Sequence, residues 1–306
     1  MEDIFDAIAR LKKERNAIIL AHVYQPKEIQ EVADFCGDSF ALAQQAAKTD
    51  ADVIVFCGVR FMAETANILS PDKITLLPNM EAGCRMFDDT LDAKVRAVLQ
   101  EHPEYTVVSY VNTPASVKAL STICCTSSNA VAVVDSLPKD AEILFVPDQN
   151  LGSFTAAKTQ HKIHGWASCC PTHAALTVEE LQAAKAEHPG AKVLMHPECR
   201  PEVRALADYV GSTMGIIHYA EDSTDQEFII ATECGVFAPL EQRCPGKKFY
   251  PAGRLMLCPN MKMITLDMVK QSLETLEPRM VVPEDIRNKA RQSLERMLAI
   301  SGGKKA

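Results

Sequence analysis

The chain has 306 residues, a formal net charge of −8 and a composition of 47% hydrophobic and 24% charged residues. This length predicts two or three small domains rather than one core. The negative charge argues against nucleic acid or an anionic membrane as a partner, and no apolar run approaches the ~20 residues of a membrane span. The N-terminus shows no signal-peptide pattern, so we expect a cytoplasmic protein.

The chain contains eleven cysteines, an odd number. In a cytoplasmic protein they are not expected to form a disulfide framework. Most of them are expected to be small buried residues, because free cysteine packs as an apolar side chain. Any cysteine with a chemical role therefore has to be recognised by its position in a pattern.

The first 84 residues predict alternating helices and buried strands. Residues 2–15 place Ile4, Ile8 and Leu11 on one face, as an amphipathic helix does. The apolar run 17–21 is typical of a buried strand in a parallel sheet. The remainder of this stretch predicts helices at 27–35, 40–48 and 61–69 and strands at 53–57 and 74–77.

The same alternation restarts twice. Residues 85–170 predict a helix at 89–100, strands at 106–109 and 143–146, and a short helix between them. In residues 171–264, Thr177 and Glu180 form a capping box before a helix that runs to about 188, and strands follow at 193–195 and 228–231. Closing helices are predicted at 265–276 and 283–298, and we expect residues 265–306 to fold back onto the first stretch.

Polar landmarks recur in these three stretches with nearly the same period. The first set is His22, Tyr110 and His196, at steps of 88 and 86 residues. Tyr24, Asn112 and Glu198 lie two positions further on. Hydroxyl residues recur at the same steps, and cysteines recur at steps of 86 and 88: Ser39, Ser127 and Thr213, then Cys84, Cys170 and Cys258. Three sets in one order indicate an internal triplication, with units 1–84, 85–170 and 171–264.

Each unit alternates strand and helix, which predicts the α/β class, with three similar three-layer α/β/α (Rossmann-like) domains and parallel sheets. Ligands of such sheets bind beyond the carboxyl ends of the strands, where every landmark falls. If the three units surround a pseudo-threefold axis, all the landmarks converge on one central site.

Three cysteines from three units suggest a metal site. A four-iron cluster usually takes four thiolates, so three would leave one iron open as a Lewis acid. A second interpretation is a catalytic zinc ion with three protein ligands. A third is that the three cysteines are simply buried and match the period by chance. Cys169 competes with Cys170 for the ligand role, but the shared Cys-Pro pattern of Cys170 and Cys258 favours Cys170.

The remaining landmarks have binding or proton-transfer chemistry. Residues 211–213 are suited to holding an anion at a helix start, although helix N-capping is the ordinary role of such hydroxyls. His22 and His196 are candidate acids or bases, since histidine titrates near neutrality when unperturbed. Tyr24 and Glu198 are further proton-transfer candidates, and Asn112 is expected to orient a partner.

Nine motifs along nearly the whole chain closely resemble the quinolinate synthase family, the A proteins of bacterial and archaeal NAD synthesis. They are residues 21–25 (AHVYQ), 37–39 (GDS), 110–112 (YVN), 125–127 (CTS), 147–152 (PDQNLG), 170–173 (CPTH), 196–199 (HPEC), 211–215 (GSTMG) and 258–261 (CPNM). The resemblance implies three α/β domains around a [4Fe–4S] cluster. It also implies condensation of iminoaspartate (iminosuccinate) with dihydroxyacetone phosphate to quinolinate, phosphate and water, and it suggests an L-aspartate oxidase or dehydrogenase as the source of the imine.

Matched position by position, the resemblance makes Cys84, Cys170 and Cys258 the cluster ligands. It assigns proton transfer to Tyr24 and Glu198, and substrate binding to His22, Ser39, Tyr110, Asn112, Ser127, His196, Glu198 and Thr213. We add His22 and His196 as catalytic candidates. Some relatives have a Cys-x-x-Cys-x-x-Cys run ending at the third ligand; Ala252 and Leu255 stand at the earlier two positions here, so a thiol switch in that run is absent.

Two other functions remain open from the residues alone. An iron–sulfur hydro-lyase acting on a small hydroxy acid would use the same open iron without a triose phosphate. A non-catalytic cysteine-rich metal or redox protein would bind metal without turnover, but it would leave the repeated His22, Tyr110 and His196 unexplained.

Overall fold

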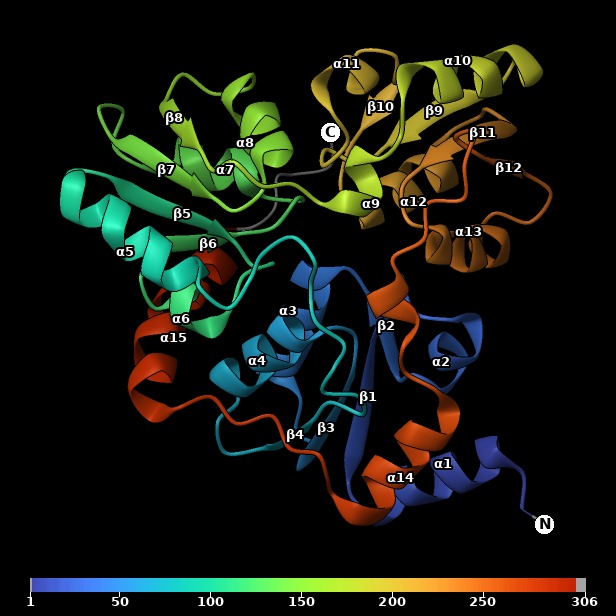
Figure 1. Ribbon diagram of the computed structural model, residues 1–306. Helices are drawn as coiled ribbons and strands as arrows, with labels where there is room; N and C mark the ends of the chain where they lie inside the picture. The colour runs from blue at the N-terminus through green and yellow to red at the C-terminus, as the bar shows by residue number, and fades with distance from the viewer. Residues whose placement is uncertain (1, 301–306) are drawn as a thin grey trace.

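The computed structural model describes residues 2–300 and contains three four-stranded sheets (Figure 1). Their strand orders are β2-β1-β3-β4, β6-β5-β7-β8 and β10-β9-β11-β12, and every neighbouring pair is parallel. The three orders are the same once each sheet is numbered from its own first strand. This confirms the predicted α/β class and the threefold repetition of a parallel-sheet unit.

The first unit is drawn in blue in Figure 1. Its first and third strands are the central ones; the third is buried along its length and the first from Ile19 onward, as expected of apolar runs in the middle of a covered sheet. The elements of this unit are α1 (Ile4–Glu14), β1 (Ala17–His22), α2 (Lys27–Val32), β2 (Phe35–Gly37), α3 (Ser39–Lys48), β3 (Val53–Cys57), α4 (Arg60–Leu69) and β4 (Ile74–Leu76).

The second unit, in green, repeats this order with a shorter helix after its first strand. Its elements are α5 (Leu91–Glu101), β5 (Thr106–Tyr110), α6 (Ala115–Lys118), β6 (Ile123–Cys125), α7 (Ala130–Asp135), β7 (Glu142–Val146), α8 (Gln149–Ala156) and β8 (Lys162–Gly165).

The third unit, in yellow and orange, begins with two helices and contains two short 3₁₀ turns. Its elements are α9 (Pro171–Ala174), α10 (Val178–Glu187), β9 (Lys192–Met195), α11 (Pro201–Arg204), β10 (Tyr209–Val210), α12 (Thr213–Asp222), β11 (Glu227–Ala231), η1 (Cys234–Val236), α13 (Phe237–Arg243), β12 (Lys248–Pro251) and η2 (Pro259–Lys262). The predicted capping box at the start of α10 is confirmed, with Thr177 and Glu180 each accepting from the other's backbone N–H.

Of the six edge strands within the described residues, the apolar pattern predicts only β4 (Ile74–Leu76), as the strand at 74–77. β2, β6 and β10 are only two or three residues long and lie in segments read as loops before the hydroxyl landmarks. β8 and β12 were likewise not predicted, because their side chains are half-buried or exposed and do not form an apolar run. The helix predicted at 27–35 ends at Val32, since Phe35 already belongs to β2.

The two closing helices divide between two units. α14 (Leu266–Thr275) packs against α1 and β3, and its Val269 and Leu273 join the core of the first unit. α15 (Glu284–Ala299) packs against α6 and β6 and also against α4, and its Leu294 and Met297 join the core of the second unit. Residues 265–300 therefore do not lie on the first unit alone, and residues 301–306 of the predicted fold-back lie outside the described residues.

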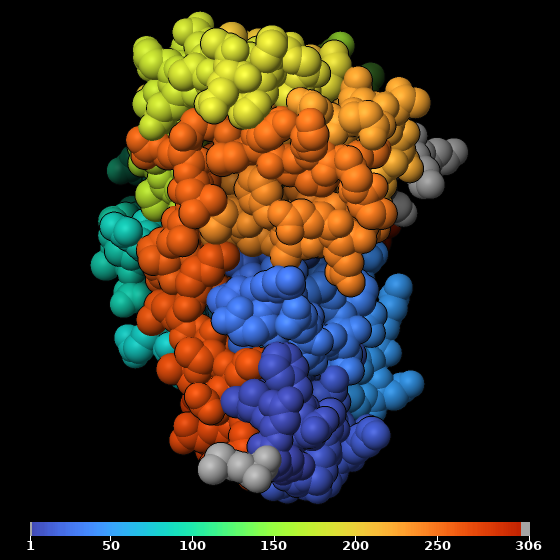
Figure 2. All heavy atoms as spheres, turned by 90° about the vertical axis from the view of Figure 1, so that its right-hand side faces the viewer, coloured from blue at the N-terminus to red at the C-terminus, as the bar shows by residue number. Residues whose placement is uncertain are grey.

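The segment that leads from the third unit to α14 runs down the outside of the molecule onto the first unit, as the orange surface in Figure 2 shows. Cys258 and η2 belong to this segment. Within residues 2–300, no helix combines the length and apolar composition needed to cross a bilayer.

Candidate active site

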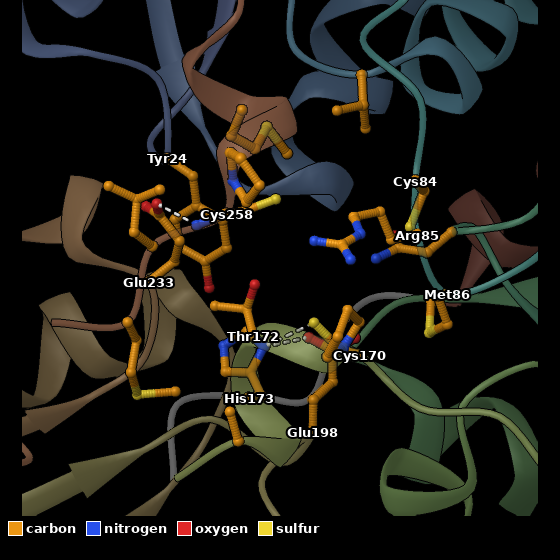
Figure 3. Close-up of a pocket in the computed structure, with 18 of the residues that line it drawn as sticks. Tyr24, Cys84, Arg85, Met86, Cys170, Thr172, His173, Glu198, Glu233 and Cys258 are labelled. Atoms are coloured by element: carbon orange, nitrogen blue, oxygen red, sulfur yellow. Dashed lines mark hydrogen bonds and ion pairs between the residues drawn. The ribbon is translucent and has the colours of Figure 1, made fainter. Parts of the chain in front are cut away.

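The three landmark cysteines line one pocket of about 230 Å³ where the three units meet (Figure 3). Cys84 comes from the loop after β4, Cys170 immediately precedes α9, and Cys258 immediately precedes η2. The spacing argument therefore predicted their convergence correctly. Most of the remaining wall is apolar, with Val59, Phe61, Met86, Pro171, Met256, Leu257, Pro259 and Met261 among the lining residues.

Two of the cysteines are held by the same local structure. Each stands at a helix N-cap with proline at the first helical position, where the missing proline N–H costs nothing. The backbone N–H of Cys170 donates to Asp148 Oδ2 (2.8 Å), and that of Cys258 donates to Glu233 Oε1 (3.1 Å). Asp148 and Glu233 are both fully buried. A buried carboxylate thus fixes the backbone at each of these two cysteines.

Cys84 is held differently. Asp148 and Glu233 lie two residues after β7 and β11, and the corresponding residue after β3 is Val59. No carboxylate takes that place in the first unit. Its cysteine loop is instead tied to α4 by a backbone hydrogen bond from the Arg60 N–H to the Ala82 carbonyl (2.7 Å).

A second, smaller pocket of about 40 Å³ is lined by all eight predicted substrate-binding residues. Tyr24, Asn112, Glu198 and Met261 line both pockets, so the two spaces adjoin. The eight residues come from all three units and include every member of the histidine–tyrosine and hydroxyl landmark sets: His22, Ser39, Tyr110, Asn112, Ser127, His196, Glu198 and Thr213.

The strand register explains why the landmarks coincide. His22 pairs with Gly37 and Tyr110 pairs with Cys125, and each hydroxyl landmark follows two residues later. Asp38 caps α3 by accepting from the Ala41 N–H, and Ser212 caps α12 by accepting from the Gly215 N–H. The preceding residue thus does the capping, which leaves the hydroxyls of Ser39 and Thr213 on the pocket wall.

His22 is buried and uncharged. Its Nδ1 accepts a hydrogen bond from the Tyr24 backbone N–H (3.1 Å), so the ring proton is on Nε2. Burial, together with smaller contributions from the neighbouring His196 and Lys262, lowers the pKa of His22 to about 3. At neutral pH His22 therefore offers the pocket a neutral N–H donor.

Glu198 lies between two histidines. Its Oε2 is 3.1 Å from His173 Nδ1 and 3.2 Å from His196 Nδ1, and all three side chains are buried. Burial alone would raise the pKa of Glu198, but the two histidines outweigh it and lower the pKa, so the carboxylate is ionised. His196 Nε2 lies 3.2 Å from the Ser127 hydroxyl, and burial lowers the pKa of His196, which keeps this ring neutral.

The ionised Glu198 affects Asp148 in turn. Burial and the nearby negative charge of Glu198 raise the pKa of Asp148. The other Glu198 oxygen, Oε1, is buried and has no hydrogen-bond partner among residues 2–300, and the same holds for Asn112 Oδ1. These two acceptor atoms are available to a bound molecule.

Tyr24 is held by the third unit. Its hydroxyl is 2.8 Å from Thr213 Oγ1 and 2.7 Å from Thr232 Oγ1. Its backbone carbonyl accepts from Lys262, and Gly235 approaches so closely that a Cβ there would stand 2.6 Å from the Tyr24 Cα. Burial raises the pKa of the Tyr24 phenol well above its usual value, so the hydroxyl keeps its proton at neutral pH. Burial raises the pKa of Tyr110 likewise.

The sequence analysis assigned no role to four residues that build this site: Asp148, His173, Thr232 and Glu233. His173 Nε2 meets the Thr232 hydroxyl at 3.0 Å, which joins Glu198 to Tyr24 through hydrogen bonds. Asp148 and Glu233 could have been found by applying the repeat once more, to the second residue after the third strand of each unit. Thr232 and His173 have no counterpart in the repeat that would have identified them.

The donor set fits a group larger than one ion. The pocket volume is several times the ~30 Å³ that one water molecule occupies, and its three thiols come from three sides. Burial raises the pKa of Cys84 to about 12 and also raises the pKa of Cys170 and Cys258, so a bound metal has to supply the charge that stabilises the thiolates. Three thiols, an apolar wall and adjoining oxygen acceptors suit an iron–sulfur cluster.

Comparisons with known proteins agree with these features. The family model described as quinolinate synthetase A protein matches residues 6–299. A quinolinate synthase of Desulforudis audaxviator is 50% identical over 98% of this chain and 99% of its own length. Quinolinate synthase 1 of Methanosarcina acetivorans is 49% identical over 97% and 98%, and a quinolinate synthase of Geobacter metallireducens is 50% identical over 98% of each chain. The chain therefore belongs to the quinolinate synthetase A family.

Proposed function

We propose that this protein is a quinolinate synthase that condenses iminoaspartate (iminosuccinate) with dihydroxyacetone phosphate to give quinolinate, phosphate and water. The observation that carries the proposal is the meeting of two pockets, one lined by Cys84, Cys170 and Cys258 and the other by the eight polar residues. The membership of the family supports the same reaction.

The three cysteines would hold a [4Fe–4S] cluster in the larger pocket. When bound, such a cluster supplies a Lewis-acidic iron that no cysteine occupies. Glu198 and Asn112 line both pockets and have free acceptor atoms, so they face a substrate that reaches from one pocket into the other.

The polar pocket would bind the anionic ends of the substrates by hydrogen bonds rather than by ion pairs. The hydroxyls of Ser39, Ser127 and Thr213 and the Nε2–H of His22 are neutral donors. Ser39 and Thr213 also stand in the first turns of α3 and α12, where the helix dipole favours a phosphate or carboxylate.

Tyr24 and Glu198 would move protons in opposite directions. Tyr24 is a phenol that keeps its proton, and Glu198 is an ionised carboxylate with one free oxygen. During condensation the substrates form a carbon–carbon bond and a carbon–nitrogen bond, and they lose phosphate and water. Tyr24 would give a proton to a leaving oxygen, and Glu198 would accept one. His22 and His196, both neutral, would orient the reacting groups and assist the remaining proton transfers.

The imine substrate hydrolyses readily, so an L-aspartate oxidase or dehydrogenase is the expected source, and we place the reaction in the cytoplasm. Neither nucleic acid nor a membrane is an expected partner of a chain with net charge −8.

Two measurements test the proposal. Anaerobically purified protein should contain about four irons and four sulfides per chain, and both should be lost in Cys170→Ala but kept in Cys244→Ala, a buried cysteine in the core of the third unit. The protein should then form quinolinate only when iminoaspartate and dihydroxyacetone phosphate are both present. Failure of metal-free protein to take up iron and sulfide on anaerobic reconstitution would exclude the cluster, and turnover without the triose phosphate would indicate a hydro-lyase.

A further inference from the structure

Within residues 2–300, the metal-ligating atoms that lie close enough to share one ion are not the three cysteine sulfurs. They belong to Cys170, His173 and Glu198, whose ligand atoms are all within 4.8 Å of one another. Figure 3 shows these three side chains converging, two from the start of α9 and one from the loop after β9. We propose that Cys170, His173 and Glu198 form a binding site for a single divalent transition-metal ion, such as Zn²⁺, in protein that holds no cluster.

The distances between the ligand atoms support a tetrahedral site. His173 Nδ1 is 3.2 Å from Cys170 Sγ and 3.1 Å from Glu198 Oε2. Tetrahedral zinc with its usual bond lengths would separate nitrogen from sulfur by about 3.5 Å and nitrogen from oxygen by about 3.3 Å. Binding would therefore widen the two contacts of His173 by only a few tenths of an ångström, and Cys170 Sγ and the Glu198 carboxylate already lie within 4.8 Å of each other.

The contacts of His173 suit a cation at this place. His173 Nδ1 faces both a sulfur and an ionised carboxylate oxygen, and one ring nitrogen cannot hydrogen-bond fully to both. Glu198 is 3% exposed, and its Oε1 has no partner among the described residues. A metal ion between the three side chains would satisfy the carboxylate and the imidazole together.

The surrounding residues already orient the three ligands. Thr232 Oγ1 lies 3.0 Å from His173 Nε2. It can accept a hydrogen bond from a proton on Nε2, which would leave the Nδ1 lone pair directed toward the metal. His196 lies 3.2 Å from Glu198 Oε2, and Asp148 accepts from the Cys170 N–H. All three ligands line the larger pocket, so a fourth coordination position would open into it, as in catalytic zinc sites.

The mixed donor set also separates this site from the proposed cluster. Thiolate, imidazole and carboxylate together suit zinc, whereas a cluster takes thiolates. Both sites need Cys170, so one excludes the other if the cysteines hold the cluster of the proposed function. Zinc bound to cluster-free protein would then block the uptake of iron and sulfide. The zinc site itself needs neither the cluster nor turnover.

Titration of metal-free, full-length protein with Zn²⁺ under anaerobic conditions, against a chromophoric chelator, tests the site. One zinc per chain is expected. Binding should be lost in Cys170→Ser and weakened at least 10-fold in His173→Gln and Glu198→Gln, and Thr232→Val should weaken it 10–100-fold through the imidazole. Cys84→Ser and Cys258→Ser serve as matched controls and should bind zinc as the native chain does.

Substitution with Co²⁺ gives a second readout, because a thiolate ligand adds a charge-transfer band that Cys170→Ser should remove and Cys84→Ser should keep. Loss of zinc in Cys84→Ser or Cys258→Ser, with full binding in His173→Gln, would overturn the proposal in favour of a three-cysteine ion site. Absence of binding to the folded native chain would also overturn it. Neither result would bear on quinolinate formation, which is measured separately.

Discussion

The first and third units place different side chains at the same two positions of the repeat. Two residues beyond the histidine landmark, the first unit has Tyr24 and the third has Glu198. Two residues after the third strand, the first unit has Val59 and the third has Glu233. The third unit thus contributes two buried carboxylates where the first contributes a phenol and an apolar side chain.

The second unit is intermediate, with Asn112 and Asp148 at these positions. The repeat therefore supplies equivalent positions around the site. The three units carry different residues at those positions, and so contribute different chemical groups. The carboxylates of the third unit pair with histidines and a lysine, and the first unit carries the neutral phenol that we propose as the proton donor. Four changes test this division, from the largest expected effect to the smallest.

Tyr24→Phe should lower kcat by about 10²–10⁴-fold, because we propose the buried phenol as the proton donor of the first unit. Its effect on the free energy of unfolding should be only about 1 kcal/mol, the contribution of its hydrogen bonds. Steady-state kinetics and urea unfolding on cluster-loaded protein measure both. Tyr250→Phe, which removes a hydroxyl bound to Glu227 outside the site, is the control. Full turnover in Tyr24→Phe would refute the assignment.

Glu233→Gln should lower the free energy of unfolding by about 3–5 kcal/mol, because Lys262 would lose its buried partner and the Cys258 N–H would lose its acceptor. Glu227→Gln removes an exposed ion pair with Lys248 in the same unit, and it should cost less than about 1 kcal/mol. Urea unfolding of both variants tests the difference. Equal losses would mean that the carboxylate at this position of the third unit has no special role.

His22→Gln should change how stability depends on pH. In the native chain the unfolded state takes up a proton at His22 below its usual pKa near 6.5, while the folded state resists it down to about pH 3. Stability is therefore lost as the pH falls through this window, by about 2 kcal/mol between pH 6.5 and 4.5. The variant should lose that much less over the same interval in urea unfolding. The exposed His102→Gln is the control, and a variant curve parallel to the native one would contradict the prediction.

Asp148→Asn should cost about 1–3 kcal/mol of unfolding free energy, because the amide can replace only one of two backbone acceptors. The loss should be smaller than in Glu233→Gln, since Asp148 has no lysine or arginine ion-pair partner among the described residues. Urea unfolding of the two variants side by side makes the comparison. A larger loss in Asp148→Asn would reverse the proposed ranking of the two carboxylates.

Much of the fold followed from local patterns. Apolar runs predicted the central strands β1, β3, β5, β7, β9 and β11, because strands buried on both faces consist of continuous apolar residues. The edge strands other than β4 were not predicted, since two to four residues are too few to show a periodicity. The destination of α15 was also not predictable, because an apolar face does not specify which core it joins.

The sequence by itself determined the triplication, the convergence of the three cysteines and the membership of the polar pocket, because a period near 87 residues places equivalent residues at equivalent strand ends. Only the tertiary structure decided the electrostatics. The pairing of Glu198 with His173 joins separate segments of the third unit, the link from His173 through Thr232 to Tyr24 joins the third unit to the first, and the neutrality of His22 comes from burial. Such effects depend on contacts between residues far apart in the chain and on the loss of water around them. Neither follows a regular spacing, so neither can be predicted from the sequence.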